Sequence, residues 1–114
     1  MVSPGRNQGQ ADAQVTLGAL HVMGQVLPQD YREALRWYRL AAEQRHAGAQ
    51  YNLGIMYAKG YGVLQDYVQA YMWWSLAAAK GDETASSARK QLAEKMSRSQ
   101  IAEAQRLARE WRSK

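Results

Sequence analysis

The chain has 114 residues, of which 46% are hydrophobic and 22% charged, and its formal net charge is +5 at pH 7. A chain of this length forms one domain, and its few prolines and many Ala, Leu, Gln and Arg residues favour helices over a sheet. It contains no cysteine, which excludes disulfides, thiolate metal sites and a cysteine nucleophile.

Residues 1–10 are expected to form a flexible N-terminal arm. They lack the apolar run that a signal peptide requires, so the expected location is the cytoplasm. No stretch of the chain approaches the roughly 20 apolar residues that span a bilayer. Membrane insertion is therefore not expected.

One internal repeat organises the rest of the chain. The pattern that begins at Ala13 begins again at Ala49, and Trp37 recurs as Trp73, an offset of 36 residues in both cases. A period of roughly 20 to 50 residues, in units too small to bury their own apolar face, is typical of a stacked solenoid. We expect a single solenoid domain over 11–114. Its parts are two repeats and a capping pair of helices: 13–48, 49–84 and 85–113.

Each repeat is predicted to begin with one helix, here called an A helix, followed by a turn. The first A helix is expected at about residues 11–23. The A helices share an apolar stripe of the same spacing: Ala13, Leu17 and Leu20 in the first, Ala49, Leu53 and Met56 in the second. Gly60 and Gly62 then supply residues that can take positive φ and turn the chain.

A second helix, the B helix, completes each repeat at about residues 30–45 and 66–80. Asp30 and Asp66 open these helices, because an aspartate at this position accepts a hydrogen bond from a free N–H of the first turn. The residues that would complete a capping box lie three positions later, at Glu33 and Gln69.

Aromatic rings and alanines share the apolar face of the B helices. Trp37 and Trp73 occupy equivalent positions, and both are expected in the core. Rings that face glycine or alanine let neighbouring helices approach closely. Gly54 is therefore expected where two helices cross.

Residues 49–78 follow the pattern A-Q-x-x-L-G-x-x-Y-x-x-G-x-G-V-x-x-D-x-x-x-A-x-x-W-x-x-L-A-A, which resembles the Sel-one-like repeat (SLR) family, relatives of the tetratricopeptide repeat. The resemblance implies an all-α superhelix of about six antiparallel helices, with the A helices lining its concave face. The first repeat departs from the second at three positions: His21 stands where the second repeat has Tyr57, Val26 where it has Gly62, and Arg45 where it has Gly81.

The two ends of the solenoid are expected to differ. Ser97 and Gln100 predict a cap for a final amphipathic helix, whose polar outer face would close the C-terminal end. The first A helix has no preceding B helix. Its open face would bind a second copy to form a homodimer, be covered by the N-terminal arm, or be tolerated because its residues are small.

No catalytic, cofactor-binding or metal-ligating set is predicted, and the chain is not expected to be an enzyme. His21 aligns with Tyr57 and is expected to be a packed or rim residue. His46 is expected near the end of a B helix, where an imidazole suits the helix dipole. Neither H-E-x-x-H nor a phosphate-binding G-x-x-x-x-G-K-[ST] occurs.

The predicted function is a protein–protein interaction module, with the partner-binding residues at A-helix positions that packing does not use. The candidates are Val15, Ala19, Val22, Met23, Tyr51, Ile55, Lys59 and Lys95. Such a groove, apolar at one end, would accept a helix or an extended peptide, and its lysines would steer an acidic flank. The alternative is that the apolar members merely complete the packing of a shallow surface.

The positive charge makes nucleic-acid binding the alternative function. Basic residues gather on the first B helix and on the last helix: Arg32, Arg36, Arg39, Arg98, Arg106, Arg109, Arg112 and Lys114. A basic helix face contributes salt-dependent phosphate contacts. Glutamates are interspersed among these residues, however, and the repeat assigns most aromatic rings to the core rather than to stacking platforms.

Overall fold

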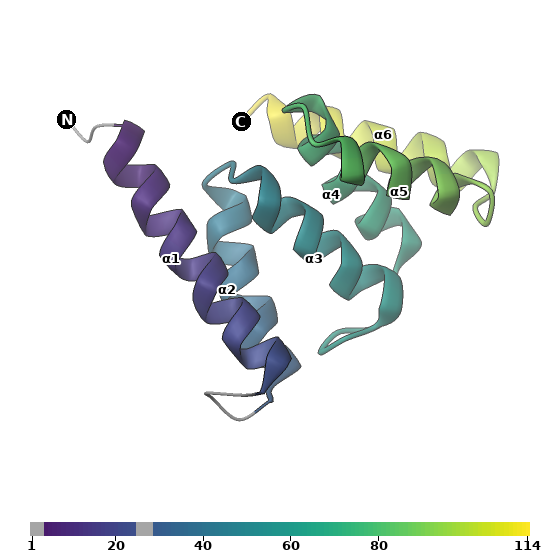
Figure 1. Cartoon of the computed structure of the whole chain (residues 1–114). Coiled ribbons are helices and arrows are strands. Elements are labelled where there is room, and N and C mark those ends of the chain that lie inside the picture. The colour runs from purple at the N-terminus through teal and green to yellow at the C-terminus, as the bar shows by residue number, and fades with distance from the viewer. Residues whose placement is uncertain (1–3, 25–28) are drawn as a thin grey trace.

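The computed structural model describes residues 4–24 and 29–114, and this part of the chain is all-α, as predicted. Its six helices are α1 (Pro4–Met23), α2 (Tyr31–Glu43), α3 (Ala47–Lys59), α4 (Tyr67–Ala79), α5 (Glu83–Ala93) and α6 (Arg98–Arg112). They form two layers, in which α1, α3 and α5 lie toward the viewer and α2, α4 and α6 lie behind (Figure 1). The A helices of the sequence analysis are thus α1, α3 and α5.

The first helix begins earlier than predicted. It starts at Pro4 rather than near Ala11, so part of the segment expected as a flexible arm at 1–10 is helical. Proline suits the first position of a helix, because its missing N–H would have no partner there and its φ is already helical. The apolar stripe from which the start was predicted begins only at Ala13, which explains the difference.

The predicted caps are confirmed at both B helices. Asp30 accepts a hydrogen bond from the N–H of Glu33, and Asp66 accepts one from the N–H of Gln69, each at 3.1 Å. The predicted capping box is not completed at either helix: the Glu33 carboxylate pairs with the Arg36 guanidinium at 3.2 Å, and the Gln69 side chain does not bond back to the N-cap. The capping box predicted at the start of the last helix is present in α6.

The role expected of His46 is wrong. This residue lies beyond α2 and is the N-cap of α3, where its Nδ1 accepts a hydrogen bond from the N–H of Ala49 at 3.0 Å. Its Nε2 lies 2.7 Å from the Asp12 carboxylate, so Nε2 carries the proton and donates. Asp82, one repeat later, caps α5 in the same way through the N–H of Ala85.

The two repeats share a contact between a glycine of the A helix and a ring of the B helix. In the second repeat a Cβ added at Gly54 would overlap the indole of Trp74, and in the first a Cβ at Gly18 would overlap the phenol ring of Tyr38. Each pair is therefore a close helix crossing, as predicted for Gly54. Burial at this contact raises the pKa of the Tyr38 hydroxyl.

The core is centred on α4, which packs against α3, α5 and α6. The Trp73 ring is 5% exposed and meets the Trp111 ring of α6 edge-on, with the ring centroids 5.6 Å apart. Trp37 occupies the equivalent position in α2 but is only partly buried, which corrects the expectation that both rings lie in the core. The reason is that α2 packs against α1 and α3, and no described helix covers Trp37 as α6 covers Trp73.

Arg45 holds the left-handed backbone conformation that Gly81 has in the second repeat, with φ values of 69° and 98°. Residues with a Cβ rarely adopt it. The Arg45 guanidinium lies 4.8 Å from the centre of the Trp111 ring and donates to the Lys114 carbonyl at 3.1 Å. These contacts join the end of the first repeat to the last helix and help to hold the turn.

Replacing Gly54 by alanine should lower the free energy of unfolding by about 1–3 kcal/mol, because the added methyl group overpacks the crossing with Trp74. Alanine is the better helix former by roughly 1 kcal/mol, which opposes the overpacking. A net loss of stability therefore shows that overpacking outweighs helix propensity. The matched control is Gly9→Ala in α1, where no atom lies within 4 Å of the added Cβ. The control should be neutral or stabilising in urea unfolding followed by circular dichroism.

Truncating Trp73 to alanine should cost about 3–5 kcal/mol of stability, because a large buried ring and its edge-on contact with Trp111 are lost. The same change at Trp37 should cost clearly less, since that ring is partly solvated. Chemical denaturation of the two variants under identical conditions gives the comparison. Equal losses would show that the burial of the two positions does not differ as described.

Candidate functional site

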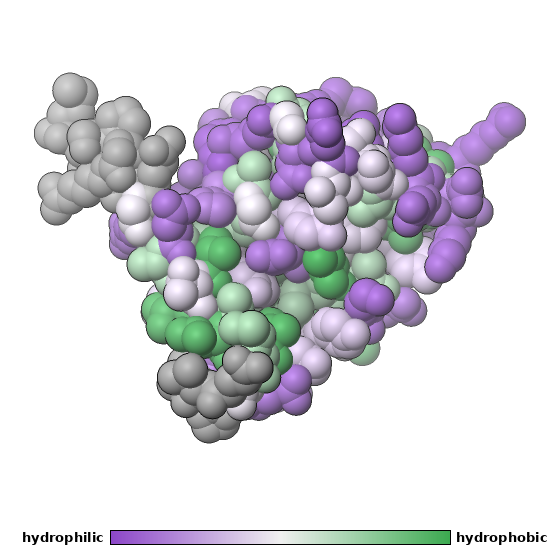
Figure 2. Space-filling view, in the orientation of Figure 1, coloured by the Kyte–Doolittle hydropathy of each residue, from purple (hydrophilic) through white to green (hydrophobic). Residues whose placement is uncertain are grey.

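The predicted partner-binding residues lie on α1 and α3, except Lys95, which was expected on an A helix but lies in the turn after α5. The face formed by α1, α3 and α5 is called the A face below. Figure 2 shows this face: apolar surface gathers over the C-terminal half of α1, and hydrophilic surface predominates toward α5. The gradient from an apolar to a polar end agrees with the residue types that the three helices carry.

The A face is hollowed between α3 and α5 into a cleft of about 460 Å³, called the α3–α5 cleft. It is lined by residues of α3, α4 and α5 and of the turn after α5: Ala58, Lys59, Tyr67, Trp74, Ala88, Gln91, Leu92, Glu94 and Lys95. Rings and aliphatic side chains thus share this cleft with charged groups. Such a mixture suits one apolar anchor of a partner flanked by polar groups.

Trp74 is the largest side chain of this lining, and two contacts orient it. Its Nε1 donates a hydrogen bond to the Tyr51 carbonyl of α3 at 2.9 Å, and its ring lies 6.3 Å from the Tyr51 ring at an interplanar angle of 28°. The missing side chain of Gly54 leaves room for the indole against α3. The ring is therefore positioned before any partner arrives, which lowers the entropy cost of binding.

The predicted binding residues divide into two groups in the structure. Lys59, at the end of α3, and Lys95, in the turn after α5, are both exposed, and both line the α3–α5 cleft. The apolar members are half-buried, except for Met23, which is 55% exposed. Those that pack against the core, and so serve stability, are Val15, Val22, Tyr51 and Ile55. Ala19 is also half-buried.

Sequence reasoning missed Tyr67, Trp74 and Glu94 as parts of this surface. The two rings were assigned to the core because they lie on the apolar stripe of a B helix. Tyr67 is half-buried and packs against the core while it lines the cleft, whereas Trp74 is 7% exposed and belongs to the core, as predicted, although it also borders the cleft. The signal that could have found them is the repeat itself, because a groove between successive A helices must have a B helix as its floor.

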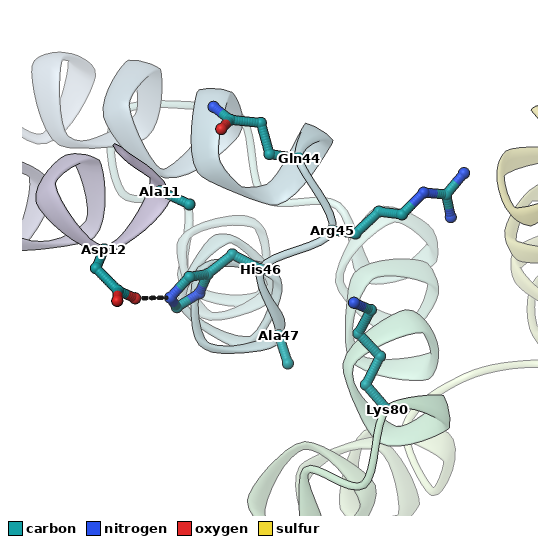
Figure 3. Close-up of a pocket in the computed structure, with 7 residues that line it drawn as sticks. All are labelled: Ala11, Asp12, Gln44, Arg45, His46, Ala47 and Lys80. Atoms are coloured by element: carbon teal, nitrogen blue, oxygen red, sulfur yellow. Dashed lines mark hydrogen bonds and ion pairs between the residues drawn. The ribbon is translucent and has the colours of Figure 1, made fainter. Parts of the chain in front are cut away.

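A second cavity, of about 420 Å³, lies where α1 meets the α2–α3 turn and the end of α4 (Figure 3). The Asp12–His46 pair points into this region, while Arg45 extends away from it toward α6. Both ring nitrogens of His46 are already engaged, one by the N–H of Ala49 and one by Asp12. The pair therefore joins α1 to the start of α3 and has no nitrogen free for proton transfer.

Other chemistry was sought in the described part of the chain. Within residues 4–24 and 29–114, no group of three or more His, Asp or Glu side chains is placed to hold a metal ion. His21 is half-buried, consistent with a packed residue. Among the helices that the structure describes, none has both the length and the apolar character needed to cross a membrane.

Several solved structures, including the following two, are similar to this chain. One is a protective antigen present in uropathogenic Escherichia coli strains that displays an SLR fold, with a TM-score of 0.88 and 32% identity over 91% of this chain. The other is a Sel1 repeat protein from Oxalobacter formigenes, with a TM-score of 0.72 and 34% identity over 80% of this chain. The chain spans only 22% and 37% of the lengths of these two proteins. No curated protein sequence matches it.

The model of the Sel1 repeat matches residues 11–46 and 47–82. These units have the predicted period of 36 residues, and each begins two positions before the boundaries expected from the sequence. Together they cover more than half of the chain, and their A and B helices are α1 to α4. The chain belongs to the Sel1 repeat family.

Proposed function

We propose that this chain is a non-catalytic protein-interaction module that binds a helix or an extended peptide of its partner on the A face. The observation that carries the proposal is the α3–α5 cleft, which is lined by the half-buried Tyr67 and Ala88 and bordered by Trp74 and Leu92, each 7% exposed. A preformed aromatic surface beside aliphatic side chains is the usual seat of an anchor residue in an interface. Sel1 repeats are, in general, protein-interaction modules.

The rim of this cleft favours a partner segment with acidic residues. Lys59 and Lys95 are exposed at its edge, and Glu94 is the one carboxylate among the lining residues. Charges on a rim act mainly on the association rate and on the choice of partner, while the buried anchor supplies most of the affinity.

Repeat symmetry extends the proposed site to the apolar half of the A face. The residues 36 positions before those of the α3–α5 cleft lie on α1, α2 and α3: Val22, Met23, Tyr31, Tyr38, Asn52, Ile55, Met56, Ala58 and Lys59. A partner segment long enough to cross α3 would contact both halves. Its apolar part would lie toward α1 and its acidic part toward α5.

The open face of α1 is a second docking surface, for which a second copy of the chain is the proposed occupant. Leu17 and Leu20 are partly exposed, whereas the equivalent Leu53 and Met56 of α3 are buried. A helix packed on α1 would therefore remove apolar surface of Leu17 and Leu20 from water. Sedimentation velocity separates a dimer formed through this face from a monomer.

Nucleic-acid binding through the basic helix faces is the less favoured function, because several of those side chains are already engaged. Arg39 donates to the Tyr57 hydroxyl, and Arg36 pairs with Glu33. Arg106 pairs with both Glu103 and Glu110. Alternating charges of this kind do not form the continuous basic track that a phosphate backbone requires.

The proposed site predicts how binding responds to charge reversal. A peptide selected from a random library against the wild-type chain should lose about tenfold or more in affinity on Ile55→Glu or Lys59→Glu, as measured by fluorescence anisotropy. Circular dichroism shows whether Ile55→Glu is still folded. Lys59 is exposed, so Lys59→Glu is not expected to unfold the chain. The matched control is Arg32→Glu on the exposed side of α2. Loss on Arg32→Glu with no effect of Lys59→Glu would move the site to the opposite face.

A further inference from the structure

A third cavity is a cleft lined by three arginines. It has a volume of about 390 Å³ and is lined by residues of α4, α5 and α6: Ser75, Arg89, Gln105, Ala108, Arg109 and Arg112. We call it the arginine cleft. It shares no lining residue with the α3–α5 cleft, and no carboxylate is among its lining residues.

The charges of α6 are sorted between two faces of the helix. Gln105, Ala108, Arg109 and Arg112 follow the i, i+3, i+4, i+7 spacing and form the face that lines the cleft. The carboxylates of this helix lie on the other side, where Arg106 donates to Glu103 at 3.0 Å and also to Glu110. The hydrogen bond from Arg106 lowers the pKa of Glu103. The acidic groups nearest in sequence are thus neutralised away from the cleft.

Arg89 of α5 is held in place at the inner side of the cleft. Its guanidinium lies 5.8 Å from the centre of the Tyr71 ring, and its Nη1 lies 3.4 Å from the hydroxyl oxygen of Ser75. Ser75 is 6% exposed, and because it accepts from Arg89 its own proton remains available to a ligand. A fixed guanidinium and a hydroxyl donor therefore face the cleft before anything binds.

None of these three arginines has a carboxylate within ion-pair distance in the part of the chain that the structure describes. Arginines in the last turn of a helix interact favourably with its dipole, which is a sufficient reason for Arg109 and Arg112 to lie at the end of α6. It does not account for Arg89, which comes from another helix and points into the same space. Three like charges in one cleft repel one another unless an anion lies between them.

We propose that the arginine cleft binds the dianionic phosphate group of a phosphate monoester. A guanidinium fork matches the oxygens of a phosphate, and such a group offers three terminal oxygens and two charges to three guanidiniums, the Ser75 hydroxyl and the Gln105 amide. A carboxylate offers two oxygens and one charge, which satisfies fewer of these donors. A nucleic-acid strand needs an extended basic track, whereas these arginines line one cleft.

This site goes beyond the proposed function, since it lies on other residues and can be present or absent independently of binding at the A face. The test is a titration of the whole chain at constant ionic strength, followed by ¹H–¹⁵N NMR. The probes are glycerol phosphate, a short peptide containing phosphoserine, and the same peptide with serine. Saturable shifts at Ser75, Arg89 and Gln105 are expected with both phosphate esters and not with the serine peptide. The tighter-binding ester indicates whether the natural source is a small molecule or a modified protein.

Two variants and one control make the test specific. Arg109→Gln and Arg112→Gln, both at exposed positions, should each weaken the phosphate esters about tenfold, the usual effect of removing one charge-assisted hydrogen bond. Arg98→Gln removes the same charge from the first turn of α6, outside the cleft, and should leave binding unchanged. Equal weakening by Arg98→Gln, or no saturable shift, would overturn the proposal. A further probe is a single-stranded oligonucleotide with and without a terminal phosphate. If both forms bind more tightly than either ester, the proposal is also overturned.

Discussion

The structure depends on the close contact between a glycine of each A helix and an aromatic ring of the B helix that follows it. Gly54 and Trp74 make this contact in the second repeat, and Gly18 and Tyr38 make it in the first. A bulky ring fills the space between two helices only if the opposite helix presents no side chain there. The pair therefore sets both the separation of the helices and the position of the ring, and its recurrence 36 residues later makes the two repeats alike.

This contact also connects the core to the proposed binding surface. One side of the Trp74 ring packs against Gly54, its Nε1 is bonded to the Tyr51 carbonyl, and the ring still lines the α3–α5 cleft. The floor of the cleft is thus part of the packed interior, because it belongs to α4, which packs against three other helices. Recognition groups supported in this way lose little freedom on binding. The rim lysines, in contrast, are solvated and can adapt to a partner.

Much of this fold could be predicted from the sequence because the repeat compares the chain with itself. The offset of 36 residues predicted the aspartate caps of α2 and α4 and the close crossing at Gly54, all of which depend on local pattern or on a glycine at a fixed position. The failure at Trp37 depends on packing far away in the sequence, whereas the failure at His46 concerns a local N-cap. Trp37 and Trp73 are equivalent in the pattern, but only Trp73 is covered by α6. His46 was assigned to the end of α2, although its counterpart Asp82 marks the position as an N-cap. The lysines of the α3–α5 cleft were anticipated, while its rings were not, because a stripe pattern cannot show which packed rings also border a cleft.

The central claim is that Gly54 and Trp74 act as one unit, and a double-mutant cycle tests it most directly. The free energies of unfolding of the wild type, Gly54→Ala, Trp74→Ala and the double variant would be measured by urea denaturation. If the alanine methyl is unfavourable only because it meets the indole, Gly54→Ala should become neutral or stabilising once Trp74 is truncated, with a coupling energy of about 1–3 kcal/mol. A cost of Gly54→Ala that is the same with and without the indole would contradict the claim.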